Sequence, residues 1–162
     1  IERGRSGEID VRTGILNPGE VSGVPIIREL LAGIGADDPL TLIDCPPGAA
    51  CAVMECVREA DLCVLVAEPT RYGAHNLGMV DALCEEFHKP RVAVLNKCMD
   101  GAGNPSEAYC RERGIPIVAQ IPFDEELGRL SSMGVPVTTR LPWVKAQFQE
   151  LLGRLTKGVD RA

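Results

Sequence analysis

The sequence predicts an α/β fold in which a parallel sheet carries helices on both faces. Short apolar runs that end in polar or turn residues alternate along the chain with longer stretches of helical period. Such alternation of strands and helices is typical of parallel sheets joined by right-handed crossovers. A chain of 162 residues that is 45% hydrophobic is long enough for one core, so we expect a single domain over 21–162 behind a hairpin extension over 1–20.

The amino-terminal extension has the pattern of a hairpin. Apolar and charged residues alternate over 8–12, Thr13-Gly14 provides a turn, and Ile15-Leu16 follows it. This alternation predicts a half-exposed hairpin that is closed by the Asn-Pro-Gly sequence at 17–19. Over 24–34 the apolar residues follow the helical period with a proline in the first turn, so we expect a helix there.

Residues 40–48 contain the strongest candidate for a functional site. The apolar run at 40–43 ends in Asp44 and a Pro-Pro-Gly turn, which predicts a strand buried on both faces with Asp44 at its carboxyl end. Ligands of open α/β sheets bind at this end of the strands, so Asp44 is a candidate phosphate-sensing or metal-binding residue. The alternative is that Asp44 only caps the helix predicted over 49–60.

Three further strands are predicted, each followed by polar or turn residues and then by a helix. They cover 62–67, 91–95 and 115–121. The helix after the second of these has the clearest ends, with Asn104 as its cap and Gly114 just past its last turn.

Two more helices follow the last strand. Asp124 can cap one that runs through Leu130, and apolar residues over 144–155 mark the other.

Four consecutive strands therefore end in polar or turn residues, namely Asp44, Glu68, Asn96 and the segment 122–124. Because parallel strands present their carboxyl ends at one edge of a sheet, we expect these residues to lie together on an active face. Lys97, which follows Asn96, is expected to brace a neighbouring loop rather than to take part in chemistry.

Charge and hydropathy exclude several classes of partner. The net charge of −6 and a pI near 5.0 argue against nucleic-acid binding, which needs clustered Lys and Arg. No apolar run approaches the roughly 18 to 20 residues of a membrane span, so no membrane partner is expected. We expect a cytoplasmic protein. Because the sequence starts with Ile1, we also expect a piece of a longer one.

The seven cysteines show no metal-binding or disulfide pattern. They never occur as Cys-x-x-Cys, and most lie within predicted helices and strands, where a free cysteine behaves as a small hydrophobe in a reducing compartment. The alternative is a cluster held across a dimer by Cys45 or Cys51.

Four motifs resemble, in order and spacing, the later motifs of the MinD/ParA/Mrp group of P-loop ATPases, the CobQ/CobB/MinD/ParA superfamily. They are Asp-Cys-Pro-Pro-Gly at 44–48, Val-Leu-Val-Ala-Glu-Pro-Thr at 64–70, Val-Leu-Asn-Lys at 94–97 and Ile-Pro-Phe-Asp at 121–124. The segment 7–20 is similar to the hairpin after the insert in members that carry an inserted ferredoxin domain. The resemblance implies a P-loop NTPase-like, Rossmann-like three-layer fold.

The resemblance also implies roles for individual residues. Asp44 would be the acid that holds Mg²⁺ through water, and Gly48 would sense the γ-phosphate of ATP through its main chain. Asn96 would hydrogen-bond the adenine. The remaining nucleotide contacts would come from Pro47, Glu68, Pro122, Phe123 and Asp124. Position 99 is Met rather than an acid, which favours adenine over guanine.

One departure from the family pattern is decisive. The chain contains no Gly-x-x-x-x-Gly-Lys-[Ser/Thr] loop or variant of it, and no ferredoxin cysteines. We therefore expect the carboxyl-terminal part of such an ATPase, lacking the first strand and the phosphate loop. Within a longer parent it would bind ATP and Mg²⁺, and an iron–sulfur cluster only if a ferredoxin insert lies upstream.

Two classes of function remain open. The first is part of an ATPase that acts as a homodimer with a metalloprotein or iron–sulfur client. The second is a non-catalytic α/β dimerisation or docking module. If the first strand is absent, strands 40–43 and 62–67 are expected to pair directly through a right-handed crossover.

Overall fold

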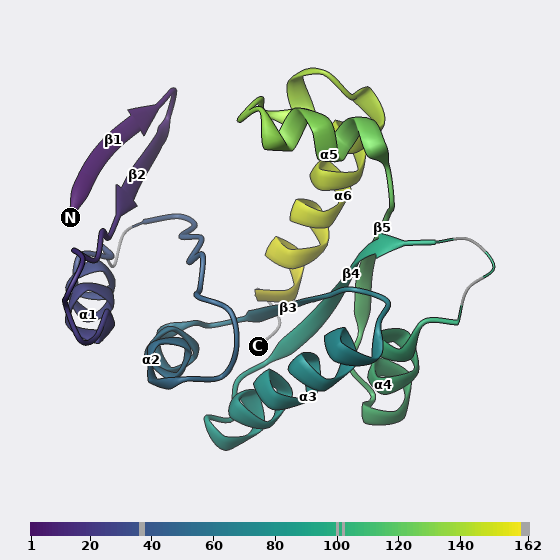
Figure 1. Cartoon of the computed structure of the whole chain (residues 1–162), viewed down its shortest axis with the longest axis horizontal. Coiled ribbons are helices and arrows are strands. Elements are labelled where there is room, and N and C mark those ends of the chain that lie inside the picture. Colours follow the sequence, from purple (N-terminus) through teal and green to yellow (C-terminus); the bar gives the residue numbers. More distant parts are fainter. Residues whose placement is uncertain (36–37, 100, 102, 160–162) are drawn as a thin grey trace. The chain divides into compact units, whose positions relative to one another are not determined.

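The computed structural model describes residues 1–35, 38–99, 101 and 103–159 (Figure 1). The chain forms two compact units, Ile1–Ala60 and Asp61–Ala162.

The first unit opens with a hairpin that differs from the predicted one. Strands β1 (Glu2–Ser6) and β2 (Ile9–Thr13) pair antiparallel, and Ser6 lies opposite Ile9. Gly7 occupies the connecting turn with φ +62°, a conformation that glycine adopts without steric cost. The prediction that Ile15-Leu16 forms the second strand is wrong, because the partner of β2 is the strand before it.

Two helices follow in the first unit, as predicted. They are α1 (Val24–Ala32) and α2 (Cys51–Glu59). The helices pack against each other, and Arg28 donates a hydrogen bond of 2.8 Å from Nη2 to Oε1 of Glu55. Pro25 lies in the first turn of α1, where its missing N–H has no helical partner to lose.

The strand predicted over 40–43 is absent from the structure. These residues form irregular chain, and Leu42 is 80% exposed. A strand exists only where its main-chain groups find a ladder partner, and apolar composition alone does not supply one. Asp44 therefore does not stand at the end of a strand, which corrects the prediction.

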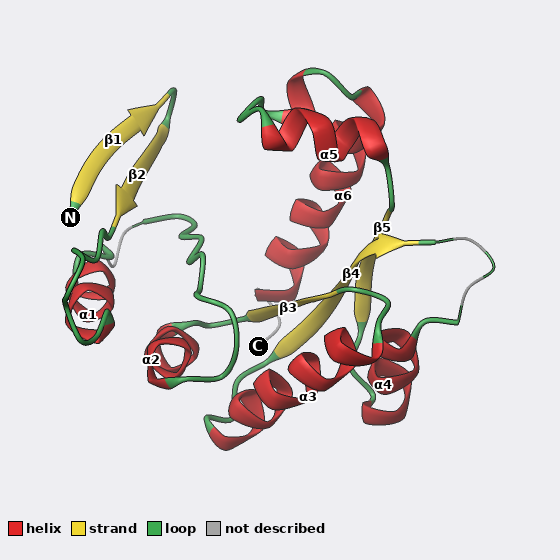
Figure 2. Ribbon diagram, viewed as in Figure 1, coloured by secondary structure: helices red, strands yellow, loops and turns green. Residues whose placement is uncertain are grey.

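The second unit contains a three-stranded parallel sheet, which confirms the predicted α/β class (Figure 2). Its strands are β3 (Cys63–Ala67), β4 (Arg91–Cys98) and β5 (Ile117–Pro122), in the order β3-β4-β5. Cys63 pairs with Arg91, and Ala67 pairs with Leu95. The central strand β4 is buried through Ala93, Val94 and Leu95, as expected for a strand covered on both faces.

Helices flank this sheet. Figure 1 shows α3 (Arg71–Glu86) and α4 (Pro105–Arg113) side by side next to the sheet, with α6 (Pro142–Val159) on its other side. Helix α5 (Glu125–Ser132) and the short 3₁₀ turn Val137–Thr139 connect β5 to α6. Side chains from each layer are fully buried, among them Cys84 of α3, Leu95 of β4 and Val144 of α6.

The helix caps predicted from the sequence are confirmed. The Asn104 side chain accepts a hydrogen bond of 3.1 Å from the main-chain N–H of Glu107, and Gly114 ends α4 with φ +67°. Asp124 accepts a hydrogen bond of 2.7 Å from the N–H of Leu127. These contacts span three residues, so a local sequence pattern is enough to determine them.

Strand β3 lies at the edge of the described sheet. Within the described part of the chain it hydrogen-bonds to β4 alone, so the predicted pairing between 40–43 and 62–67 is wrong. Its side chains alternate: Cys63, Leu65 and Ala67 are buried, whereas Val66 is 64% exposed.

No described helix is long and apolar enough to cross a membrane.

Candidate functional site

The carboxyl edge of the sheet brings together the site residues predicted in the second unit. Glu68 follows β3, Asn96 lies near the end of β4, and Pro122 ends β5. Helices α3 and α5 begin just beyond β3 and β5. The sheet thus gathers residues that are separated by more than 50 positions in the sequence.

Glu68 is held from two sides. Its carboxylate accepts a hydrogen bond of 2.6 Å from Nζ of Lys97, and its main-chain carbonyl accepts one of 2.6 Å from the hydroxyl of Ser106. Ser106 is fully buried near the start of α4. The predicted bracing role of Lys97 is confirmed, because its ammonium group joins the ends of β3 and β4. Lys97 also has φ +58°, an uncommon conformation for a residue with a side chain.

The first turn of α3 approaches the Glu68 main chain closely. Thr70 caps the helix by accepting a hydrogen bond of 2.8 Å from the N–H of Gly73. A Cβ atom on Gly73 would lie 2.4 Å from the carbonyl oxygen of Glu68. Only glycine fits this position without a shift of the main chain.

The ends of β4 and β5 present an amide and an aromatic ring. The Asn96 side-chain oxygen accepts a hydrogen bond of 3.0 Å from the N–H of Lys97. The N–H of Phe123 donates to the carbonyl of Cys98 at 2.8 Å, while the Phe123 residue remains 57% exposed. Burial, aided by the nearby carboxylate of Glu107, raises the pKa of the Cys98 thiol. Asp124 serves as the cap of α5.

The remaining predicted residues belong to the first unit. Asp44 and Pro47 are exposed, and Gly48 has φ +90°. Helix α2 begins at Cys51 after the N-cap residue Ala50, and no side chain caps it, so the alternative that Asp44 caps this helix is wrong. An exposed carboxylate fits a hydrated Mg²⁺, which keeps several waters and takes one or two carboxylates. No group of three or more His, Cys, Asp or Glu among the described residues could hold a metal ion.

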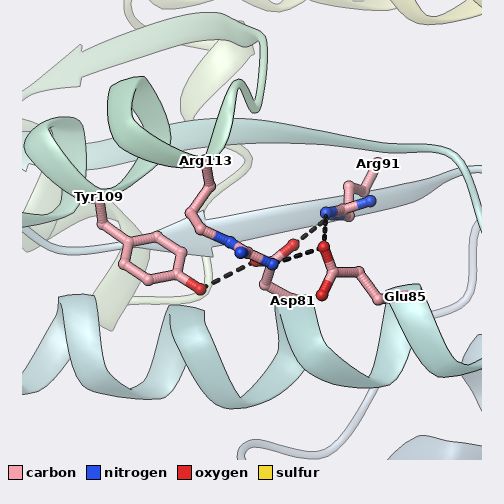
Figure 3. Close-up of polar contacts among 5 residues, drawn as sticks. All are labelled: Asp81, Glu85, Arg91, Tyr109 and Arg113. Carbon is pink, nitrogen blue, oxygen red and sulfur yellow. Dashed lines mark hydrogen bonds and ion pairs between the residues drawn. The ribbon is translucent and has the colours of Figure 1, made fainter.

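A second polar cluster was not predicted from the sequence. Asp81 is fully buried on α3, and Figure 3 shows it facing Arg91 of β4 and Tyr109 and Arg113 of α4. Tyr109 donates to Oδ2 of Asp81 at 2.9 Å, Arg113 Nε donates to the same oxygen at 3.1 Å, and Arg91 Nε donates to Oδ1. Both arginines also bind Glu85. The sequence did contain a signal, since Asp81 has the helical spacing of buried Leu77 and Cys84.

The Asp81 cluster is electrostatically balanced. Burial alone would raise the pKa of Asp81, but hydrogen bonds from Tyr109, Arg113 and Arg91 hold it below its usual value. Burial and the hydrogen bond to Asp81 raise the pKa of Tyr109. Two guanidinium groups face two carboxylates, so the cluster is suited to joining α3, β4 and α4 rather than to proton transfer.

Comparison with known proteins gives a partial match. The chain is 48% identical over 63 residues to the chlorophyllide reductase 35.5 kDa chain of Rhodobacter capsulatus. The match covers 38% of this chain and 18% of that protein. No family model matches the sequence. The comparison supports a distant relationship over part of the chain.

Proposed function

We propose that this chain is the carboxyl-terminal part of a MinD/ParA-like protein that binds and hydrolyses ATP and serves metallocofactor or iron–sulfur handling. The main support for this proposal is that Glu68, Asn96 and Phe123 all lie at the carboxyl edge of a parallel sheet. In open α/β sheets this edge binds ligands. The partial similarity to a chain of a reductase agrees with a client enzyme of this kind.

In this proposal the adenine lies against the ends of β4 and β5. Asn96 hydrogen-bonds the base, and Pro122 and Phe123 border it. The exposed ring of Phe123 supports this role because bases stack on aromatic side chains. Glu68 orients Lys97 through their 2.6 Å ion pair, and Asp124 fixes the loop by capping α5.

Asp44 and Gly48 are assigned to the phosphate end of the nucleotide. The Asp44 carboxylate would hold Mg²⁺ through water, and the positive φ of Gly48 lets the main chain approach a phosphate. Magnesium supplies positioning and charge neutralisation for phosphoryl transfer. Because the chain has no glycine-rich loop with a lysine, the phosphate cradle would come from residues outside it.

The test is ATP hydrolysis by a protein that contains this chain together with the residues encoded upstream of it. Asp44→Asn should lower turnover by roughly 100-fold or more, because magnesium positioning stabilises the transition state. Asp61→Asn is the matched control, since Asp61 is also exposed but precedes β3. Wild-type turnover by a folded Asp44→Asn protein would disprove the assignment.

The second candidate function is a dimerisation or docking module. It is favoured by β3, whose outer edge has no strand partner in the described part of the chain and whose Val64 and Val66 are exposed. An unpaired edge with an apolar face recruits another strand. If this function holds, Val66→Lys should abolish self-association, measured by light scattering, because a charged side chain on the exposed strand opposes pairing with another strand.

A further inference from the structure

Helix α3 has an outer face that points away from the sheet along the whole length of the helix. The residues of this face are spaced three or four positions apart, opposite to buried Leu77 and Cys84. They are Arg71, His75, Gly78, Ala82 and Glu86, with Met79 beside them. Gly78 is half-buried and the others are exposed, Met79 to 38%. This outer face therefore offers a continuous surface to a partner.

The two ends of the outer face carry opposite charges. Arg71 begins α3 and Glu86 ends it. Within the described part of the chain, neither side chain forms a hydrogen bond or an ion pair. The neighbouring Glu85, by contrast, is already held by Arg91 and Arg113 (Figure 3). The outer face is thus positive at its start and negative at its end, with both charges available to a partner.

A groove runs over the first half of the same face. It has a volume of about 450 Å³ and is lined by Arg71, Ala74, His75, Gly78, Met79 and, from α4, Tyr109. Gly78 contributes no side chain, and a Cβ atom there would lie 3.3 Å from the hydroxyl oxygen of Tyr109. Tyr109 is itself fixed by its hydrogen bond of 2.9 Å to Asp81. The groove can therefore receive an apolar side chain from outside.

These features are complementary to a second copy of the same face. A two-fold axis between Gly78 and Met79 would place two α3 helices antiparallel, so that each residue faces the one equally far beyond that point. Arg71 of each copy then faces Glu86 of the other, and Met79 of each copy lies opposite Gly78 of the other, over its groove. A two-fold interface uses one surface twice, which this arrangement does.

We propose that the outer face of α3 is a docking surface for a second copy of this chain, with the two helices antiparallel. Met79 of each copy fills the groove of the other, and the two pairs of Arg71 and Glu86 determine the direction of the helices. The surface lies apart from the carboxyl edge of the sheet and from the outer edge of β3. The inference therefore depends on neither of the functions proposed above.

The experiment measures the mass of the whole chain by sedimentation equilibrium over a range of concentrations, where we expect a monomer–dimer equilibrium. Arg71→Glu places like charges opposite each other at both ends and should weaken the dimer about tenfold, and Glu86→Arg should do the same. An equimolar mixture of these two variants should form a heterodimer as strong as the wild-type dimer. In that heterodimer opposite charges face each other at both ends again.

Two further variants test the centre of the surface and its specificity. Met79→Lys should abolish the dimer, because a charge would replace the apolar side chain that enters the groove. Lys145→Glu is the control, since it reverses an exposed charge on α6 and should leave the equilibrium unchanged. Circular dichroism verifies that each variant is folded.

A chain that stays monomeric at its highest soluble concentration would overturn the proposal. So would a loss of association in the two charge variants that mixing them does not reverse, because antiparallel pairing requires that rescue. Dimerisation that survives Arg71→Glu and is lost in Val66→Lys would place the interface at the edge of β3, and would overturn the proposal equally.

Discussion

The hydroxyl of Ser106 donates a hydrogen bond of 2.6 Å to the main-chain carbonyl of Glu68, 38 residues earlier in the chain. The bond joins the first turn of α4 to the end of β3, and Ser106 is fully buried there. It fixes the position of the residue that pairs with Lys97. The candidate site is therefore held in place by a side chain that takes no part in it.

Ser106→Ala should destabilise the protein by about 0.5 to 1.5 kcal/mol, because the carbonyl of Glu68 would lose one of its two donors and keep only the N–H of Thr70. Urea unfolding measures the change. Ser132→Ala is the control, since the Ser132 hydroxyl donates to the Arg129 carbonyl on an exposed surface. Equal losses in the two variants would contradict a special role for Ser106.

Gly73→Ala should also destabilise the protein, by about 1 to 3 kcal/mol, because the new methyl group would force α3 away from the Glu68 carbonyl. Gly128→Ala is the matched control within α5, where a Cβ meets nothing within 4 Å. Alanine is the better helix former, so this variant should gain up to about 1 kcal/mol. Thermal unfolding that shifts both variants in the same direction would refute the steric argument.

Asp81→Asn should cost about 2 to 4 kcal/mol, because a neutral amide leaves Arg91 and Arg113 without their buried partner. This loss in the free energy of unfolding is near the low end for removing one partner of a buried ion pair, because both arginines remain partly exposed to water. Glu85→Gln removes a half-exposed partner of the same arginines and should cost less than about 1 kcal/mol. Equal losses would show that burial of Asp81 does not govern the strength of the cluster.

The Asp81 cluster also predicts a dependence of stability on pH. The folded pKa of Asp81 is lowered, so the unfolded chain takes up its proton first as the pH falls. The contribution of Asp81 is complete above the ordinary aspartate pKa of about 3.9 and disappears as the pH falls from there through the lowered value. Unfolding free energies measured between neutral and acid pH should fall less steeply below this point in Asp81→Asn than in the wild type. Parallel curves would contradict the lowered pKa.

The chain by itself should bind ATP weakly or not at all. Without a glycine-rich loop and its lysine, the phosphates lose most of the main-chain donors and the charge on which such sites depend. Titration calorimetry with ATP and Mg²⁺ is the measurement. Micromolar binding that requires magnesium would show that the phosphate cradle lies within this chain after all.

Features that depend on neighbouring residues could be predicted from the sequence alone. Asn104 and Asp124 cap their helices through hydrogen bonds to residues three positions on, and Gly114 ends α4 in the left-handed conformation. Strands β3, β4 and β5 were equally predictable, because their apolar runs are bounded by turn residues. The polar ends of these strands then meet at one edge, since parallel strands point the same way.

Features that need a partner far along the chain could not be predicted in this way, because they depend on how the chain packs. The apolar run at 40–43 has the composition of a strand but does not hydrogen-bond to another strand. Strand β2 pairs with β1, which precedes it, instead of with the residues after it. Asp81 became the centre of a polar cluster only when α4 and β4 brought Arg113 and Arg91 to it. Main-chain and charged groups are stable in the interior only when paired, and the sequence does not state which distant group completes each pair.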